Sequence, residues 1–233
     1  MFKNIKPLKI SDNLDTKYRR MSHLDMIHFI KLIPLGVDEI ISISGIAPIF
    51  IAGGDDLEFV MFSGLSPNHT IFHNNNNIAI PKILNTYPFF MIKVINENNK
   101  NSVVIAIDKN DKYVNKSEKI SIFNKDKDLT NETQDLIDDV KVLYKQRILS
   151  KAIVKELQKK DLLIKQSFNV KVNDEIKPVI SDYYIVDKNR LNKLDDETLA
   201  LWSRRGWMGI IDAHIYSLRN FKKLVDLVSQ DDK

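Results

Sequence analysis

Short apolar runs separated by turn residues dominate the first half of the chain. Five of them are rich in Ile, Val and Phe, which predicts strands because β-branched and aromatic residues favour pleated surfaces. Residues 53–56 suit a hairpin turn, since Gly and Asp tolerate positive φ, and the polar segment 96–101 suits a loop between strands that pair antiparallel. The predicted strands are 46–52, 57–62, 70–73, 89–95 and 102–107.

The apolar positions change to a helical period near residue 130. A long helix is expected from Thr130 or Asn131, with Asn131 as the cap and Gln134 in the reciprocal capping-box position. Its apolar residues recur at spacings of three and four, which predicts one buried face. The predicted buried residues are Leu136, Val140, Leu143, Ile148, Leu149, Ala152, Ile153 and Leu157.

The C-terminal third predicts a β-hairpin followed by two closing helices. Alternation at 168–172 and the apolar run 179–186 flank a turn at 173–175, whereas the polar segment 109–129 is expected to be a loop. Asp195 or Asp196 caps the first helix, and Gly206 suits its left-handed end. The second helix is expected from residue 207 to about 228. Its apolar side would contain Trp207, Ile211, His214, Leu218, Phe221, Val225 and Val228.

These elements predict an α+β fold. It would have a β-rich N-terminal half with antiparallel strands, a long central helix, a β-hairpin and two closing C-terminal helices. Seven Gly and seven Pro in 233 residues are few for a barrel or sandwich with many tight turns. Residues 1–22 are polar and basic, and we expect an arm that lies on the surface or is disordered. Residues 23–229 would form a single domain.

The distribution of charge and the amino-acid composition exclude several classes of function and argue against others. The net charge of +4 comes from residues 1–31, which hold seven Lys or Arg against three Asp or Glu, so a nucleic-acid partner is not expected. The absence of Cys excludes disulfides and thiolate chemistry. No secretory signal is recognisable and the longest apolar tract, 40–52, is too short for a membrane span. We therefore expect a cytoplasmic protein, or a surface-associated one if a signal-less route exports it.

His214 is the sharpest candidate for chemistry, because it interrupts an apolar helical stripe. An imidazole can serve as a general base when a carboxylate orients it, but Asp212 points elsewhere on the helix. A buried histidine that is hydrogen-bonded for structural reasons is the competing interpretation. Trp202, Trp207 and Arg219 are further candidates for ligand or partner contact. The adjacent pair at 204–205 is more simply a complement to the helix dipole.

Known site motifs do not appear elsewhere in the sequence. His69 and His73 have the spacing of helical zinc ligands, but in a strand residues four apart are about 13 Å from each other. We expect no metal, no cofactor and no catalytic residue that the sequence can identify, because no phosphate-binding glycine loop, dinucleotide fingerprint or nucleophile elbow is present.

Ten short segments stand in a fixed order and spacing along the chain. They are 48–52, 64–65, 70–72, 79–81, 87–89, 106–108, 162–163, 183–191, 194–195 and 213–218. Together they resemble the SapC family of bacterial proteins, over a stretch from about residue 23 to residue 227 and most strongly near the C-terminus. The resemblance implies participation in surface-layer formation and supplies no catalytic residues.

Two hypotheses follow from the residues and the resemblance. The first is a non-enzymatic SapC-like protein that acts through protein contacts in surface-layer formation, as a component or as an accessory to assembly or export. Its partner would be a surface-layer protein or the export machinery, and its oligomeric state stays open. The second is an enzyme or small-ligand-binding protein with a pocket near His214 and Arg219. The sequence favours the first without excluding enzymatic activity.

Overall fold

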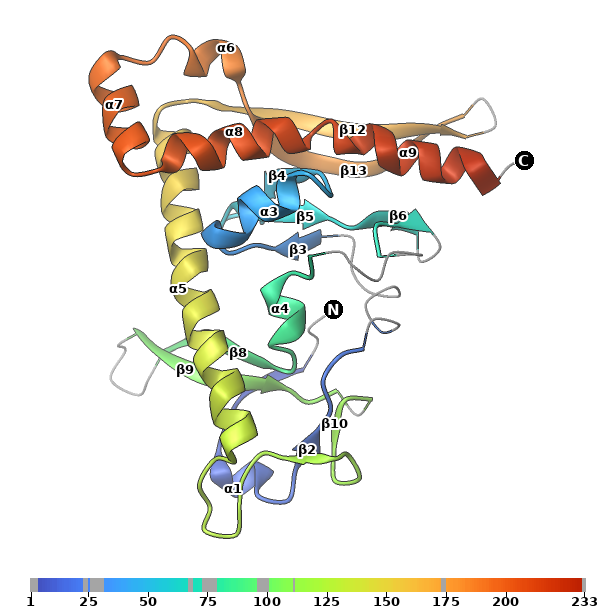
Figure 1. Cartoon of the computed structure of the whole chain (residues 1–233), viewed down its shortest axis with the longest axis vertical. Coiled ribbons are helices and arrows are strands. Elements are labelled where there is room, and N and C mark those ends of the chain that lie inside the picture. Colours follow the sequence, from blue (N-terminus) through green and yellow to red (C-terminus); the bar gives the residue numbers. More distant parts are fainter. Residues whose placement is uncertain are drawn as a thin grey trace. The chain divides into compact units, whose positions relative to one another are not determined.

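The computed structural model describes residues 4–22, 25, 32–66, 69–72, 79–95, 101–110, 112–172 and 175–231. The chain divides into two compact units. The first unit consists of residues 1–26 and 82–145, and the second of residues 27–81 and 146–233. Both mix helices with antiparallel strands, so the α+β class expected from the sequence is confirmed (Figure 1). The expected single domain over residues 23–229 stays a prediction.

The first unit is built on an antiparallel sheet with the strand order β1-β9-β8. β8 (Phe89–Ile95) pairs along its whole length with residues 101–107 of β9 (Asn101–Asp108), which confirms the two predicted strands and their antiparallel pairing. β1 (Ile5–Pro7) adds to the other edge of β9. A helical turn, α4 (Lys82–Asn85), precedes β8.

Residues 4–22 belong to this folded unit, in place of the expected surface arm. After β1 come α1 (Ile10–Asn13) and β2 (Lys17–Tyr18). β2 lies between β10 (Val114–Asn115) and β11 (Ile120–Ser121), two short strands inside the segment expected to be a loop. The physical reason is aromatic burial: the fully buried ring of Tyr18 packs edge-on against Phe89, with ring centroids 5.0 Å apart.

The second unit contains a five-stranded antiparallel sheet with the order β12-β13-β4-β5-β3. β4 (Ile49–Ala52) and β5 (Glu58–Phe62) confirm the predicted hairpin around residues 53–56. The C-terminal hairpin of β12 (Leu163–Val172) and β13 (Glu175–Val186) is longer than predicted, and its predicted turn lies partly outside the described residues. The remaining strands are β3 (Leu32–Pro34) and the separate pair β6 (Gly64–Ser66) and β7 (His69–Thr70).

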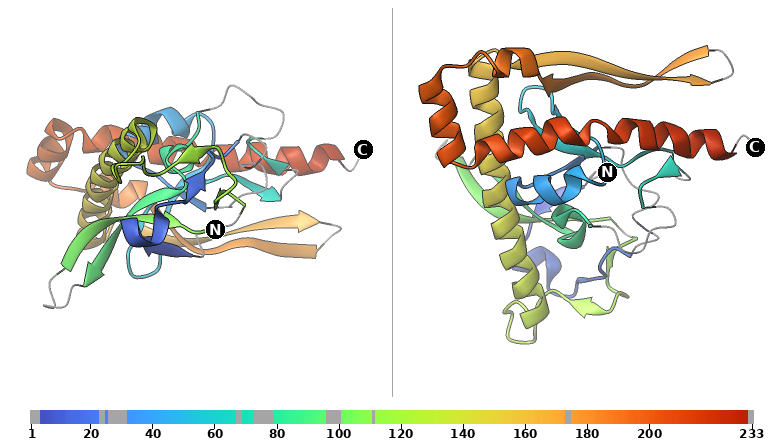
Figure 2. Two further views of the ribbon diagram at one scale, coloured as in Figure 1. Left: turned by 90° about the horizontal axis from the view of Figure 1, so that it is seen from below. Right: turned by 45° about the horizontal axis from the view of Figure 1, so that its top comes forward.

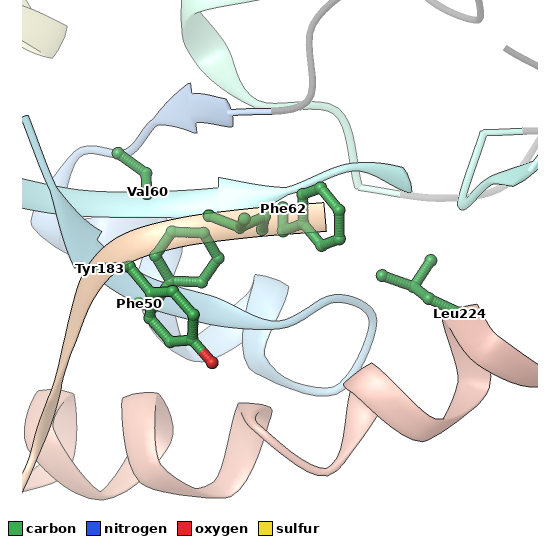
Figure 3. Packing of buried hydrophobic residues seen from close by; sticks show 6 residues of the cluster. Phe50, Val60, Phe62, Tyr183 and Leu224 are labelled. Carbon is green, nitrogen blue, oxygen red and sulfur yellow. The ribbon is translucent and has the colours of Figure 1, made fainter. Parts of the chain in front are cut away.

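Aromatic side chains from distant segments form the core of the second unit. Phe50, Phe62 and Tyr183 are buried together with Leu224, as Figure 3 shows from close by. The rings of Phe50 and Tyr183 lie 4.5 Å apart, and the half-buried Phe221 stacks on Phe50. Strands β4, β5 and β13 therefore pack against the helix that contains Phe221 and Leu224, and burial of apolar surface is the main stabilising interaction between them.

The long helix α5 (Asn131–Lys159) confirms the prediction, but its cap and part of its buried face differ. The Thr130 hydroxyl, rather than Asn131, accepts the Thr133 N–H at 3.3 Å. Ile148 and Leu149 are exposed, so their predicted burial is wrong. The stripe instead continues through the half-buried Arg147 and the buried Ser150, two polar residues that a search for apolar positions does not find. Its buried members are Leu136, Ile137, Val140, Leu143, Ser150, Ile153, Val154 and Leu157.

The final helix is interrupted, whereas the sequence predicts one continuous helix. It consists of α8 (Trp207–Ser217) and α9 (Asn220–Asp231). Between them the Leu218 and Phe221 amides bond to carbonyls three residues earlier, as in a tight 3₁₀ turn. The hydroxyl of Ser217 donates to the His214 carbonyl at 2.6 Å, and the Leu218 amide bonds to the Ile215 carbonyl in place of the His214 carbonyl.

The helices before α8 follow the predicted signals. Asp195 caps α7 (Asp196–Arg204) by accepting the Thr198 N–H at 2.7 Å, and Gly206 adopts a left-handed φ of 73°. The remaining short helices of this unit, which the sequence analysis did not predict, are η1 (Val37–Glu39), α3 (Ile40–Ser44) and α6 (Lys188–Leu191). Views of the chain from two further directions are given in Figure 2.

Backbone strain at the C-terminal end of α5 can be tested by substitution. Asp161 has a left-handed φ of 53°, while the Leu162 amide donates to the Leu157 carbonyl and the Asp161 amide to the Gln158 carbonyl, the bonds of a Schellman motif. A Cβ atom is disfavoured at this left-handed φ. We therefore expect the free energy of unfolding of Asp161→Gly to be about 1 kcal/mol higher than that of Asp161→Ala. Both variants lose the exposed ion pair with Arg190, so denaturant unfolding isolates the backbone effect. Equal stabilities would contradict it.

Candidate functional site

The imidazole of His214 is fully buried, and both of its nitrogens bind backbone groups. The Val186 N–H donates to Nε2 at 3.1 Å, and Nδ1 lies 2.8 Å from the Ile49 carbonyl oxygen. A carbonyl can only accept and an amide N–H can only donate. The ring is therefore the neutral tautomer that carries its proton on Nδ1.

This imidazole bridges two strands of the five-stranded sheet. Tyr184 of β13 pairs with Ile51 of β4, so the next pair of the same kind in that register would be Val186 and Ile49. The ring of His214 stands between the amide of Val186 and the carbonyl of Ile49, where a direct ladder bond would otherwise form. A side chain from α8 thus completes the pairing of β4 with β13.

His214 is the first of four polar residues spaced by three, which we term the polar ladder: His214, Ser217, Asn220 and Lys223. The Ser217 hydroxyl accepts the Ile49 N–H at 2.9 Å, so both backbone groups of Ile49 bind this ladder. Asn220 donates to the Ser44 carbonyl at 2.8 Å, and Lys223 to the Gly45 carbonyl at 3.2 Å. The ladder satisfies backbone groups at the end of α3 and the start of β4.

Burial determines the charge of His214. Loss of solvation lowers the pKa of the imidazole from 6.5 to about 4, and the bond to the Ile49 carbonyl opposes this only in part. The ring is therefore neutral at neutral pH. Asp212, two residues away, is exposed and is placed as the sequence analysis expects. With both nitrogens committed to backbone, the arrangement acts as a clamp between strands and not as an oriented base.

The two tryptophans lie together where α7 meets α8. Trp202 is only 2% exposed, whereas Trp207 is half-buried, and their ring centroids are 6.0 Å apart. The guanidinium of Arg205 lies 5.1 Å from the centre of the Trp207 ring. Leu201, one turn before Arg205, is 42% exposed. We call Leu201, Arg205 and Trp207 the α7–α8 corner; Trp202 lies beneath the surface.

Arg219 has different surroundings from His214. Its side chain is exposed, and its guanidinium lies 3.6 Å from the centre of the exposed Tyr216 ring. Buried His214 instead binds Val186 and Ile49. The structure therefore places these two candidates in separate environments, one solvated and one inside the core.

Sequence reasoning missed a charged cluster in the first unit. The buried carboxylate of Asp25 accepts from Arg19 at 2.8 Å and from the Ser22 hydroxyl at 2.7 Å, and it pairs with Lys112 at 3.1 Å. Burial raises the pKa of Asp25, but these bonds outweigh it and hold the pKa far below its usual range. The Arg19 guanidinium also stacks over Tyr113 at 4.4 Å. No local pattern could have indicated this cluster, since Arg19 and Lys112 are distant in sequence.

A second ion pair that the sequence did not indicate lies in the other unit. Arg147 of α5 binds both carboxylate oxygens of Glu58, each at 2.7 Å, and Lys151 pairs with Asp56 in the turn between β4 and β5. A forked Arg–carboxylate pair fixes orientation as well as contact. This pair attaches the β4–β5 hairpin to the second half of α5.

The described ranges contain no group of three or more His, Asp or Glu residues able to hold a metal ion. His23, His28 and His73 lie outside the residues that the structure describes, and His69 begins β7. In the described part of the chain, none of the helices is long and apolar enough to cross a membrane.

The fold and this site define an α+β protein whose buried histidine joins two strands. A family model described as SapC matches residues 10–224, which is most of the chain, so the protein belongs to the SapC family. The resemblance seen in the sequence is thereby confirmed. No curated protein and no solved structure matches the chain.

Removal of the imidazole should destabilise the second unit. In His214→Ala the Val186 amide and the Ile49 carbonyl lose buried partners, so we expect the free energy of unfolding to fall by roughly 2 to 5 kcal/mol. Asp212→Ala, an exposed change on the same helix, should alter it by less than about 0.5 kcal/mol. Denaturant titration measures both. A His214→Ala protein as stable as Asp212→Ala would contradict the clamp.

The lowered pKa of His214 predicts a stability loss in mild acid. The unfolded chain binds this proton below pH 6.5 and the folded chain only below about pH 4, so stability from this site is complete above 6.5 and declines as the pH falls between these values. The decline should total about 3 kcal/mol. His214→Gln should remove this slope, because a carboxamide does not titrate. The difference between the wild-type and His214→Gln stabilities at each pH removes the contribution of all other titrating groups. Parallel pH profiles of the two proteins would contradict a lowered pKa of His214.

Proposed function

We propose that this protein acts through protein contacts, without catalysis, in the formation of a bacterial surface layer. It would serve as a component of the layer or as an accessory to its assembly or export. The proposal rests on membership of the SapC family over residues 10–224. Its partner would be a surface-layer protein or part of the export machinery.

One observation of the site supports a non-enzymatic role. The sequence analysis singles out His214 as the candidate general base, yet its two nitrogens bind the backbone of β13 and β4. A base must leave its lone pair free for the substrate proton. The occupied Nε2 makes His214 a poor base and removes the main reason for an enzyme hypothesis centred on it.

The α7–α8 corner is the part of the C-terminal region that we propose for partner contact. Trp and Arg are enriched at the centres of protein interfaces, and exposed Leu201 adds apolar area beside them. The Arg205 guanidinium lies over the partly exposed Trp207 ring, 5.1 Å from its centre. A preformed aromatic and cationic surface loses little side-chain entropy on binding.

Affinity capture from the source bacterium tests the role. Tagged wild-type protein should recover a surface-layer protein or an export component, and this recovery should depend on an intact layer gene in a matched deletion strain. Fractionation of the same cells would show whether the protein is cytoplasmic or at the surface. Recovery of cytoplasmic enzymes alone would refute the surface-layer role.

The corner is tested by a matched pair of variants. Arg205→Ala with Trp207→Ala removes the cation–aromatic pair of the corner, and Tyr216→Ala with Arg219→Ala removes the equivalent exposed pair from α8. We expect the first to lower capture at least about tenfold, the effect of one lost anchor, and the second to leave it within about twofold. Equal capture by both would contradict the placement, and near-native thermal unfolding should accompany each variant.

A further inference from the structure

Two guanidinium groups stand without carboxylate partners where α7 leads into α8, at the end of the orange helices in Figure 1. Arg204 and Arg205 are both exposed, and in the described part of the chain neither forms an ion pair. By contrast, Arg147 and Arg190 of the same unit each bind a carboxylate. The chain therefore leaves two positive charges at the α7–α8 corner that no acidic side chain neutralises by contact.

The helix dipoles do not neutralise these charges either. The sequence alone favours the C-terminal dipole of α7 as their complement. In the structure, Gly206 separates the C-terminus of α7 from the N-terminus of α8, so a partial negative and a partial positive charge lie side by side and offset each other. The Arg205 guanidinium lies 5.1 Å from the centre of the Trp207 ring, and among the described residues it has no hydrogen bond to a carbonyl of α7.

The carboxylates nearest in sequence lie away from the corner. Asp196 and Glu197 are in the first turn of α7, about 10 Å or more along the axis from Arg204. Asp212 of α8 is exposed, but it comes five residues after Trp207 and so lies about 140° around the helix from it. Exposed charges further apart than about 8 Å are largely screened at physiological salt. The potential at the corner is therefore positive.

Apolar surface lies beside these charges. Leu201, one turn before Arg205, is 42% exposed, and Trp207 is half-buried. A nucleic acid or another uniformly charged polymer would need positive charge along a groove or stripe. The unit that carries the corner instead has equal numbers of basic and acidic residues. A ligand that combines carboxylates with an apolar side chain fits this compact surface better than a polyanion does.

We propose that the α7–α8 corner binds an acidic segment of a protein partner, in which carboxylate side chains flank an apolar one. The carboxylates would accept hydrogen bonds from Arg204 and Arg205, and the apolar side chain would lie against Leu201 and Trp207. Arginine suits this role because its planar fork of N–H donors matches a carboxylate, also beside an aromatic ring. The corner is the contact surface of the proposed function, on which this step rests, whereas its preference for acid follows from the two arginines.

A short acidic peptide tests this preference without a cellular partner. Both tryptophans of the chain lie at or beneath the corner, so the intrinsic fluorescence of the purified full chain reports binding there. The probe is the acetylated, amidated peptide Glu-Glu-Leu-Glu-Glu, and its counterpart has Gln in place of each Glu. At about 0.01 M salt the Glu peptide should bind at least about tenfold more tightly than the Gln peptide, and at about 1 M salt within about twofold. Equal binding at low salt, or no binding of the Glu peptide, overturns the proposal.

Charge reversal separates the two arginines from other cations of the last helices. Arg204→Glu with Arg205→Glu should weaken binding of the Glu peptide at least about tenfold and should create binding of the matching Lys peptide, a gain that misfolding cannot mimic. Arg219→Glu with Lys222→Glu changes the charge equally at exposed positions outside the corner, and should leave the affinity within about twofold. An equal loss in both double variants overturns the assignment to the corner.

Capture from cells distinguishes a failure of this contact from a failure of the surface-layer role. Where wild type recovers a partner that depends on the layer gene, Arg204→Glu with Arg205→Glu should lower the recovery at least about tenfold. Recovery that charge reversal leaves unchanged overturns the acidic contact, while the surface-layer role stands. Recovery of cytoplasmic enzymes alone refutes that role, and the peptide affinities still decide whether the corner prefers acid.

Discussion

The buried imidazole of His214 holds together two parts of the second unit that are far apart in sequence. Strands β3, β4 and β5 come from the first third of the chain, and β12 and β13 from the last third. The described register between these two blocks consists of the pair Tyr184 and Ile51. His214 extends this junction, because its Nε2 accepts a hydrogen bond from the Val186 N–H and its Nδ1–H donates one to the Ile49 carbonyl. The five-stranded sheet depends on that connection, because buried backbone groups left without partners would oppose its closure.

The polar ladder explains why α8 and α9 lie where they do. Burial of apolar surface is non-directional, whereas a hydrogen bond requires its donor and acceptor at defined positions. His214 and Ser217 bind both backbone groups of Ile49, and Asn220 binds the end of α3. The aromatic cluster around Phe50 and Phe221 then supplies the larger part of the stabilisation through burial. Polar residues specify the arrangement here, and apolar ones stabilise it.

The buried histidine and the buried carboxylates of this protein all make structural contacts. The interior uses its histidine and its buried carboxylates, Asp25 and Glu58, for hydrogen bonds and ion pairs that join distant segments. The α7–α8 corner instead exposes Leu201 and part of Trp207 to solvent. Proteins that assemble with others use surfaces of this kind.

Periodicity, caps and turn residues determined much of this protein by themselves. The β4–β5 hairpin, strands β8 and β9, the extent of α5 and the cap of α7 at Asp195 depend on neighbours in sequence, so local patterns predict them. The SapC family could be recognised from the sequence for the same reason, because short local segments carry the resemblance. Tertiary structure alone decided the exposure of Leu149, the strands near the N-terminus and the role of His214. Each of these depends on residues far away in the sequence, and a local pattern does not predict which distant group a side chain will contact.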